Sequence, residues 1–330
     1  MTKVAVLDDW QNVARQSADW SALQARAEVV FFHRAFADED EAANALNPFD
    51  VLIPMRERTP FPASLIRRLP QLRLIALPGQ RAGTLDTEAC TAQGVLICNT
   101  GGGPGSAATA ELTLGLLIAA NRRIPAGDAA IRAGRFQDDV GLGVVLHGRT
   151  LGLLGLGTIG SMVARYAQAI GLHVLAWSPN LTQERAAAAA AELVDKEGLF
   201  ARSDFVSIHL VLSPRSRGIV GAADLARMKP GAILVNTSRG PLVDEAALLD
   251  AVQSGRIVAA LDVYDREPLP AEHPLRRAPN AVLTPHIGYG TMEVFEGFYR
   301  QCIENVLAFL DGAPKRMVNA EALRPTPTGR

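Results

Sequence analysis

The 330-residue chain has little of what marks several protein classes. It holds only three cysteines, Cys90, Cys98 and Cys302, without the spacing of metal ligands, so we expect no metal. We interpret them as buried, reduced thiols of a cytoplasmic protein. It has no long basic run, and 33 Lys and Arg balance 34 Asp and Glu, which argues against a nucleic-acid partner. The longest apolar helical stretch, 112–120, is too short to span a membrane, so no membrane partner is expected.

What the chain does have is a hydrophobic fraction of 48% and enough length for two domains. Short apolar runs alternate with helical patterns, which predicts parallel strands joined by crossover helices. The predicted strands are residues 4–7, 29–32, 51–53, 72–77, 95–98, 151–154, 173–177, 205–210, 232–236, 257–261 and 282–283. The predicted helices include residues 62–69, 87–93, 106–121, 183–192, 221–228, 244–254 and 291–310. The fold class is therefore α/β, with parallel sheets in two domains.

The most informative motif is a G-x-G-x-x-G sequence made by Gly155, Gly157 and Gly160. An apolar run precedes it, and a helical pattern and a second apolar run follow. In this strand–turn–helix frame the glycines permit a tight turn, a close approach of the backbone to a pyrophosphate, and packing of the helix on the strand. The helix N-terminus then offers N–H groups to phosphates. A purely structural glycine turn is the alternative.

A second glycine cluster, 101–105, could also cradle a phosphate, but it lacks the strand–turn–helix frame. We interpret it as a crossing between domains. Ser106, which follows it, is the expected N-cap of the next helix.

Three polar residues, Arg239, Glu267 and His286, each follow a predicted strand of the second domain. Ligands of Rossmann folds bind outside the carboxyl ends of the strands. Each residue alone is more often structural. Together they supply a planar cation for a carboxylate, a carboxylate that can orient a proton donor, and a donor suited to neutral pH.

These motifs resemble the D-isomer-specific 2-hydroxyacid dehydrogenase family, which includes D-3-phosphoglycerate dehydrogenase and glyoxylate/hydroxypyruvate reductases. The resemblance rests on segments 155–160, 209–214, 236–240, 262–268 and 285–288 and covers nearly the whole chain. It implies a flavodoxin-like substrate domain, residues 1–101 and 291–330, and an NAD(P)-binding Rossmann domain, residues 102–290. The implied activity is the NAD(P)-dependent interconversion of a small D-2-hydroxy acid and its 2-keto acid, such as D-3-phosphoglycerate, hydroxypyruvate or glyoxylate.

The resemblance also implies a role for each matched residue. Arg239 binds and polarises the carbonyl and carboxylate of the substrate, His286 is the acid/base, and Glu267 pairs with it. A loop of the first domain offers backbone N–H groups to the substrate carboxylate, and its residues are Pro78, Gly79 and Gln80. The implied cofactor-binding residues are Gly155, Gly157, Thr158, Ile159, Gly160, Ser178, His209, Ser216, Thr237, Asp262, Gly288 and Thr109.

Two departures from the family pattern bear on specificity. Residues 81–84 read Arg-Ala-Gly-Thr where the family usually carries glycine and Asp-Asn, so the identity of the 2-hydroxy acid stays open. The strand after the glycine motif ends at Ser178, where an NAD-selective protein carries an acid. A hydroxyl does not repel a 2′-phosphate, so both NAD and NADP are expected cofactors.

Other functions remain open at this point. One is an NAD(H)-sensing binding protein of corepressor type, because such relatives can keep the same residues. Another is oxidation of formate or phosphite on the same scaffold, although formate enzymes usually carry Gln in the role of Glu267. The resemblance implies a homodimer formed through helix 106–121, whose apolar residues surround most of its circumference. Burial within the monomer is the alternative.

Overall fold

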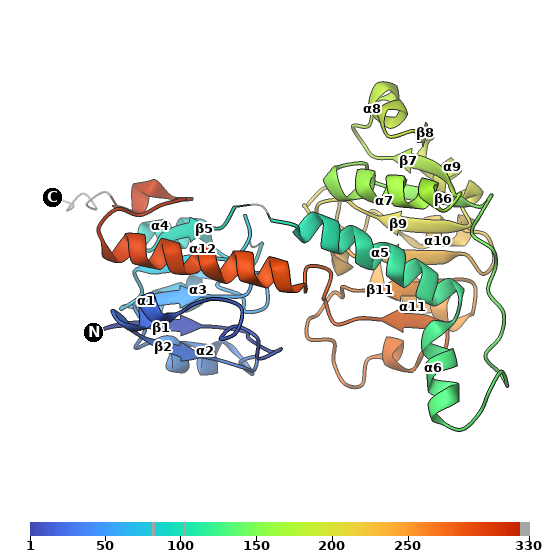
Figure 1. The fold of residues 1–330 in the computed structure, drawn as a ribbon. Helices are drawn as coiled ribbons and strands as arrows, with labels where there is room; N and C mark the ends of the chain where they lie inside the picture. Colours follow the sequence, from blue (N-terminus) through green and yellow to red (C-terminus); the bar gives the residue numbers. More distant parts are fainter. Residues whose placement is uncertain (81–82, 102, 324–330) are drawn as a thin grey trace. The chain divides into compact units, whose positions relative to one another are not determined.

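The structure, a computed structural model, describes residues 1–80, 83–101 and 103–323. The chain forms two compact units (Figure 1): unit 1 is Met1–Pro104 with Thr291–Arg330, and unit 2 is Gly105–Gly290. The division predicted from the sequence, at 101/102 and 290/291, differs from these units only at the first boundary, which the units place at 104/105. Their assignment to substrate and cofactor binding remains a prediction.

The sheet of unit 1 is parallel, with the strand order β2-β1-β3-β4-β5. Its strands are β1 (Thr2–Val6), β2 (Ala27–Phe31), β3 (Val51–Ile53), β4 (Leu74–Leu77) and β5 (Leu96–Asn99). This is the flavodoxin-like order 2-1-3-4-5. The central strands β3 and β4 are apolar and buried throughout, because helices cover both faces of such a sheet.

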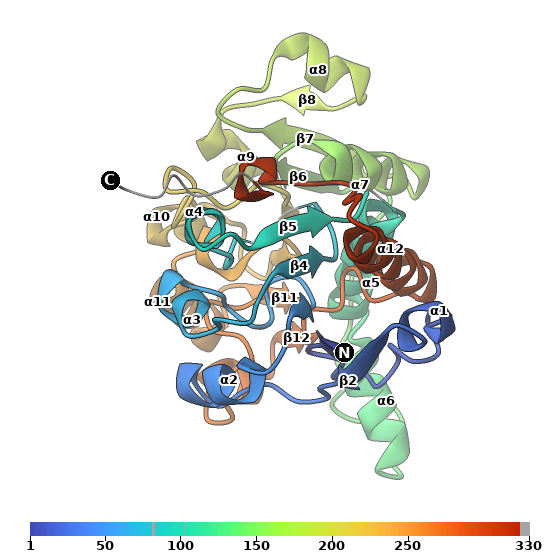
Figure 2. The same ribbon diagram turned by 90° about the vertical axis from the view of Figure 1, so that its left-hand side faces the viewer.

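Figure 2 shows α2, α3 and α4 on one face of this sheet and α1 and α12 on the other. The helices of unit 1 are α1 (Ser21–Gln24), α2 (Glu39–Leu46), α3 (Ala63–Arg67), α4 (Thr87–Ala92) and α12 (Met292–Leu310), with a 3-10 turn η3 (Ala320–Leu323). The late helix α12 packs on β4 and β5, where Asn305 Nδ2 donates to the Asn99 carbonyl at 2.8 Å. Unit 1 is therefore built from both ends of the chain.

The sheet of unit 2 is also parallel, with the order β12-β11-β10-β9-β6-β7-β8. Its strands are β6 (Thr150–Leu154), β7 (His173–Trp177), β8 (Glu192–Leu193), β9 (Phe205–Ile208), β10 (Ile233–Asn236), β11 (Val258–Leu261) and β12 (Ala281–Leu283). The strand order reverses between β6 and β9, which are hydrogen-bonded neighbours. This is the strand order of a Rossmann sheet, and ligands of such sheets bind at the reversal. The predicted α/β class is confirmed.

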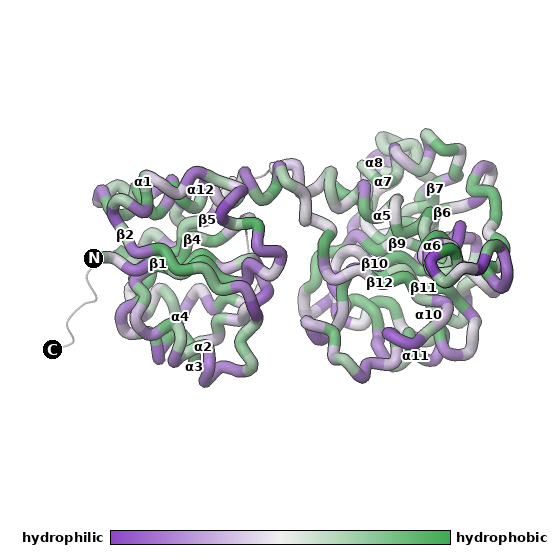
Figure 3. The backbone as a smooth tube through the Cα atoms, turned by 60° about the horizontal axis from the view of Figure 1, so that its bottom comes forward, coloured by the Kyte–Doolittle hydropathy of each residue, from purple (hydrophilic) through white to green (hydrophobic). Residues whose placement is uncertain are grey.

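Two apolar cores fill the two faces of this sheet, and Figure 3 shows the hydrophobic strands between more polar helices. One core includes residues of α5 and α7, and the other residues of α9, α10 and α11. The helices of unit 2 are α5 (Gly105–Asn121), α6 (Ile124–Arg132), α7 (Thr158–Ala169), α8 (Gln183–Ala188), α9 (Lys196–Arg202), α10 (Ala222–Arg227) and α11 (Glu245–Gln253), with 3-10 turns η1 (Gly240–Leu242) and η2 (Pro274–Arg277).

Some local predictions were wrong. Helix α5 begins at Gly105, so Ser106 lies inside its first turn and is not its N-cap. The alanine-rich helix α8 ends at Ala188, and Glu192 belongs to the short strand β8. Alanine propensity does not decide this boundary, because Ala190 takes a left-handed conformation (φ 50°) that ends the helix.

The predicted burial of the cysteines is confirmed for all three. Burial raises the pKa of Cys90 to about 12 and of Cys98 to about 11, so both stay protonated at neutral pH. Among the described residues, no helix combines the length and apolar character needed to cross a membrane.

Candidate active site

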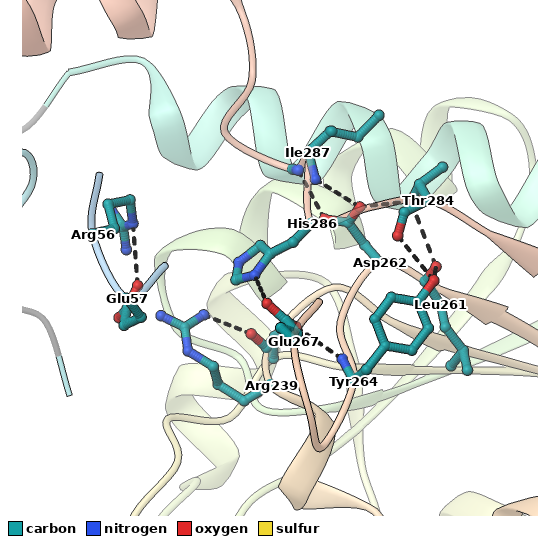
Figure 4. Close-up of polar contacts among 12 residues, drawn as sticks. Arg56, Glu57, Arg239, Leu261, Asp262, Tyr264, Glu267, Thr284, His286 and Ile287 are labelled. Atoms are coloured by element: carbon teal, nitrogen blue, oxygen red, sulfur yellow. Dashed lines mark hydrogen bonds and ion pairs between the residues drawn. The ribbon is translucent and has the colours of Figure 1, made fainter. Parts of the chain in front are cut away.

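Three adjacent strands of unit 2 bring the predicted polar residues to one edge of the sheet. Strands β10, β11 and β12 are neighbours, and Arg239, Glu267 and His286 follow their carboxyl ends in that order. Figure 4 shows the three side chains at this edge, with the Glu267 loop between the other two. The sheet order thus assembles residues that lie far apart in the sequence.

His286 and Glu267 form a direct pair. His286 Nδ1 lies 2.5 Å from Glu267 Oε2, and the side chains are 21% and 31% exposed. The other carboxylate oxygen, Oε1, accepts from the Tyr264 backbone N–H at 2.9 Å. Because a carboxylate only accepts, Nδ1 carries the shared proton and Nε2 is the ring nitrogen left for a reacting group.

The backbone at His286 is in the left-handed region (φ 53°), an unfavourable conformation for a side chain with Cβ. Asp262 holds it there. Asp262 is fully buried and accepts from the backbone N–H groups of Ile287 and Gly288, both at 2.8 Å, and from Thr284 Oγ1 at 2.6 Å. Burial raises the pKa of Asp262, and these hydrogen bonds oppose the shift.

The loop that carries Arg239 is fixed by close packing. The Asn236 side chain donates to the Arg239 carbonyl at 2.9 Å, and Arg239 Nη1 donates to the Ser238 carbonyl at 2.6 Å. A Cβ atom at Gly240 would lie only 2.1 Å from the Tyr264 carbonyl carbon. Only glycine therefore lets the Arg239 loop rest on the loop that leads to Glu267.

The G-x-G-x-x-G motif has the geometry of a dinucleotide cradle. Gly155 has φ 101°, and a Cβ there would lie 2.6 Å from the His209 carbonyl oxygen, while a Cβ at Gly160 would lie 2.2 Å from the Gly155 carbonyl oxygen. Gly157 has open space where its Cβ would be, and it is the N-cap of α7 with no side-chain cap. The residues thus fit a dinucleotide, because Thr158 and Ile159 begin a helix whose N-terminus is open to phosphates.

His209 lies beside the reversal point of the sheet, where β9 ends next to β6. Its Nε2 is 2.9 Å from Ser207 Oγ, and desolvation lowers the pKa of His209 to about 4. The ring is therefore neutral at physiological pH. Ser178 follows β7 and is partly exposed.

Other predicted cofactor residues have partners within unit 2. The hydroxyls of Thr237 and Thr113 are 2.7 Å apart, and Thr109 Oγ1 lies 3.2 Å from the Gly288 carbonyl, which ties α5 to the loop after β12. The Ser216 hydroxyl bonds within its own loop after β9. Cofactor contact by these residues remains a prediction.

In unit 1, the predicted substrate loop turns at Gly79 (φ 83°) between Pro78 and Gln80. The Gly79 N–H, expected to face a carboxylate, instead donates to Thr100 Oγ1 at 2.7 Å. The departure at 81–84 falls partly outside the described residues, because 81–82 are not among them. Substrate binding by this loop remains a prediction.

Sequence reasoning missed the charged residues that follow β3. A Cβ at Gly79 would lie 2.7 Å from Arg56 Nη1, so the Arg56 side chain lies against the loop. Their position in the sequence could have pointed to them, because Arg56, Glu57 and Arg58 follow the end of a buried strand, as Arg239 and His286 do.

Comparisons with known proteins agree with this geometry. Residues 114–288 match the family described as "D-isomer specific 2-hydroxyacid dehydrogenase, NAD binding domain". D-3-phosphoglycerate dehydrogenase of Archaeoglobus fulgidus is 35% identical over 276 residues, which are 83% of this chain and 52% of that protein. Glyoxylate reductase of Thermococcus litoralis is 38% identical over 274 residues, 80% of this chain and 82% of that protein.

A solved structure is also similar to this chain, both in sequence and in fold. The phosphoglycerate oxidoreductase from Vibrio cholerae has 38% identity and a TM-score of 0.89, and the match covers 95% of this chain and 100% of that one. The chain spans about half the length of the D-3-phosphoglycerate dehydrogenases it matches. The G-x-G-x-x-G cradle and the strand-end residues, together with these matches, show that the chain belongs to the D-isomer-specific 2-hydroxyacid dehydrogenase family.

Proposed function

We propose that the chain is an NAD(P)-dependent oxidoreductase that interconverts a small 2-keto acid and its D-2-hydroxy acid. The observation that carries the proposal is the 2.5 Å pair between His286 and Glu267. The pair follows strands β11 and β12, and Arg239 follows the neighbouring strand β10. The glycine cradle belongs to the same unit. Family membership supports the reaction class.

Each residue has a chemical task in this proposal. Because Glu267 holds Nδ1 of His286, Nε2 gives a proton to the keto oxygen in reduction and takes it back in oxidation. The planar guanidinium of Arg239 binds the substrate carboxylate through two N–H groups and stabilises charge on the reacting oxygen. When bound, the nicotinamide group supplies or accepts the hydride.

The test is a set of initial rates for glyoxylate, hydroxypyruvate, pyruvate and 3-phosphohydroxypyruvate with NADH and with NADPH. We expect turnover of at least one keto acid. Cofactor binding without turnover of any keto acid would instead favour an NAD(H)-sensing binding protein. Assays of formate and of phosphite with NAD and with NADP test the remaining alternative, which is oxidation of one of these two compounds.

We also propose that NAD and NADP are both used, with neither favoured by more than about 100-fold, or about 2.7 kcal/mol. Ser178 stands where an acid would repel the 2′-phosphate, and Arg185 is exposed on the next helix, α8. Ser178→Asp should shift the kcat/KM ratio toward NAD. A strict NAD preference of the unchanged protein would show that another group reads the ribose.

We also propose that the chain forms a homodimer, but through a different segment from helix 106–121, which the sequence analysis expected at the dimer contact. Leu116 and Leu117 of α5 are buried in the core of unit 2, so burial within the unit accounts for them. Large apolar side chains are exposed on α6 and the segment after it, namely Ile124, Ile131, Phe136, Leu142 and Val145. We propose that this segment contacts the second copy. Light scattering on the purified chain tests the dimer.

A cytoplasmic location is proposed as well. All three cysteines are unpaired, which suits a reducing compartment.

A further inference from the structure

The segment that carries His286 folds back on itself directly after that residue. The Gly290 N–H donates to the Ile287 carbonyl at 2.7 Å, which places Tyr289 inside a tight turn. Asp262 fixes the start of this turn, because it accepts from the Ile287 N–H at 2.8 Å. The turn brings the ring of Tyr289 against the imidazole of His286.

Tyr289 and His286 make a direct aromatic contact. Their ring centroids are 5.7 Å apart and their planes cross at 78°, which is a T-shaped arrangement. Aromatic rings favour this geometry because the positive edge of one ring meets the negative face of the other. The Tyr289 residue is only 7% exposed, so the surrounding protein keeps its ring in place. The imidazole thus has a fixed aromatic surface beside it.

The pair with Glu267 does not by itself fix the orientation of the imidazole. It holds one ring atom of His286, Nδ1, at 2.5 Å from Glu267 Oε2 (Figure 4). The ring can pivot about that atom, because the torsion next to a histidine ring has a broad preference. Nε2 lies on the other side of the ring and moves with every such pivot. A second contact on the ring restrains this motion, and Tyr289 makes one.

The two rings are supported by the same anchor. Asp262 is fully buried, and its hydrogen bond to the Ile287 N–H fixes the backbone between His286 and Tyr289. The left-handed backbone of His286 and the turn that holds Tyr289 therefore form one local structure. A reacting group is placed accurately when such a rigid support fixes its own orientation.

We infer that Tyr289 is a positioning residue of the reaction: its ring fixes the plane of the His286 imidazole, so that Nε2 is aimed at the keto oxygen when the proton is transferred. This inference rests on the proposed function. Proton transfer needs the donor within hydrogen-bond reach of the acceptor, and a small misplacement of a reacting group lowers the rate strongly. Tyr289 gives and takes no proton in this role, which requires its ring and not its hydroxyl.

The experiment compares two variants of the full chain in the reduction of the keto acid that the wild type uses best. Tyr289→Phe keeps the ring, and its kcat should stay within about 3-fold of the wild type. Tyr289→Leu removes the ring but keeps an apolar side chain, and it should lower kcat by about 5- to 50-fold with a nearly unchanged Kd for NADH. The solvent isotope effect on kcat should rise in Tyr289→Leu, because proton transfer becomes slower relative to the other steps.

Tyr166→Leu is the matched control. It makes the same change on α7, where Tyr166 is partly buried against a core of unit 2. A loss of packing alone lowers stability in both leucine variants, which thermal unfolding measures. It leaves the solvent isotope effect as it is in the wild type.

Crystal structures of the wild type and the two Tyr289 variants add a readout that does not depend on turnover. The His286 ring should keep its orientation in Tyr289→Phe and change it in Tyr289→Leu. An unchanged ring or an unchanged kcat in Tyr289→Leu, or equal losses of kcat in both variants, overturns the inference and leaves the proposed function standing. Absence of wild-type turnover with every keto acid rejects the proposed function and the inference with it. If Tyr289→Leu does not fold, Tyr289→Met replaces it in the same comparison.

Discussion

Gly157→Ala should separate the cofactor role of the glycine motif from its structural role. A Cβ at Gly157 would meet no protein atom within 4 Å, so the folded chain accommodates it. Gly→Ala stabilises a compatible site by about 0.4–1 kcal/mol, and the loss of a glycine N-cap offsets this, so the unfolding free energy should change by less than about 1 kcal/mol. The methyl group would nevertheless occupy the space where the backbone approaches the pyrophosphate.

The expected loss is that of one charge-assisted hydrogen bond to a phosphate, about 1.5–3 kcal/mol, or about a 10- to 150-fold increase in the Kd for NADH. Fluorescence titration with NADH and thermal unfolding without cofactor measure the two effects. Gly221→Ala is the control, because Gly221 is the N-cap of α10 with equally open space and lies outside the motif. An unchanged Kd in Gly157→Ala would refute the assignment of this glycine to the pyrophosphate.

His286→Ala should lower kcat for reduction by about 10²- to 10⁴-fold with a nearly unchanged Kd for NADH, and wild-type turnover would remove His286 from the mechanism. Arg239→Lys should not rescue the loss of kcat/KM in Arg239→Ala, since lysine lacks the two-pronged geometry; a near-normal lysine variant would show that charge alone suffices. His209 should make the chain less stable in acid. Between pH 6.5 and 4 the unfolded chain binds a proton there and the folded chain does not, so the unfolding free energy should fall by up to about 3 kcal/mol as the pH drops, as urea titration can show. The same slope in His209→Gln would contradict this origin.

The sequence by itself determined the α/β class, the nearly complete set of strands and the residues at their carboxyl ends. These follow from local chemistry. Apolar runs must be buried in a sheet covered on both faces, and the chain leaves each parallel strand at the same edge. That is why Arg239, Glu267 and His286 could be named together. The short strand β8 was not predicted, because the hydropathy pattern of two residues does not distinguish a strand from a loop.

Only the tertiary structure decided which polar groups meet. Asp262 and Gly288 are 26 residues apart, and their 2.8 Å hydrogen bond depends on the order of β11 and β12 in the sheet. The approach of Arg56 to Gly79 likewise depends on the pairing of β3 with β4 and on the conformation of two loops. Hydropathy and local propensity describe how each segment folds. They contain no information on the packing between segments, and that packing sets the distances on which recognition and proton transfer depend.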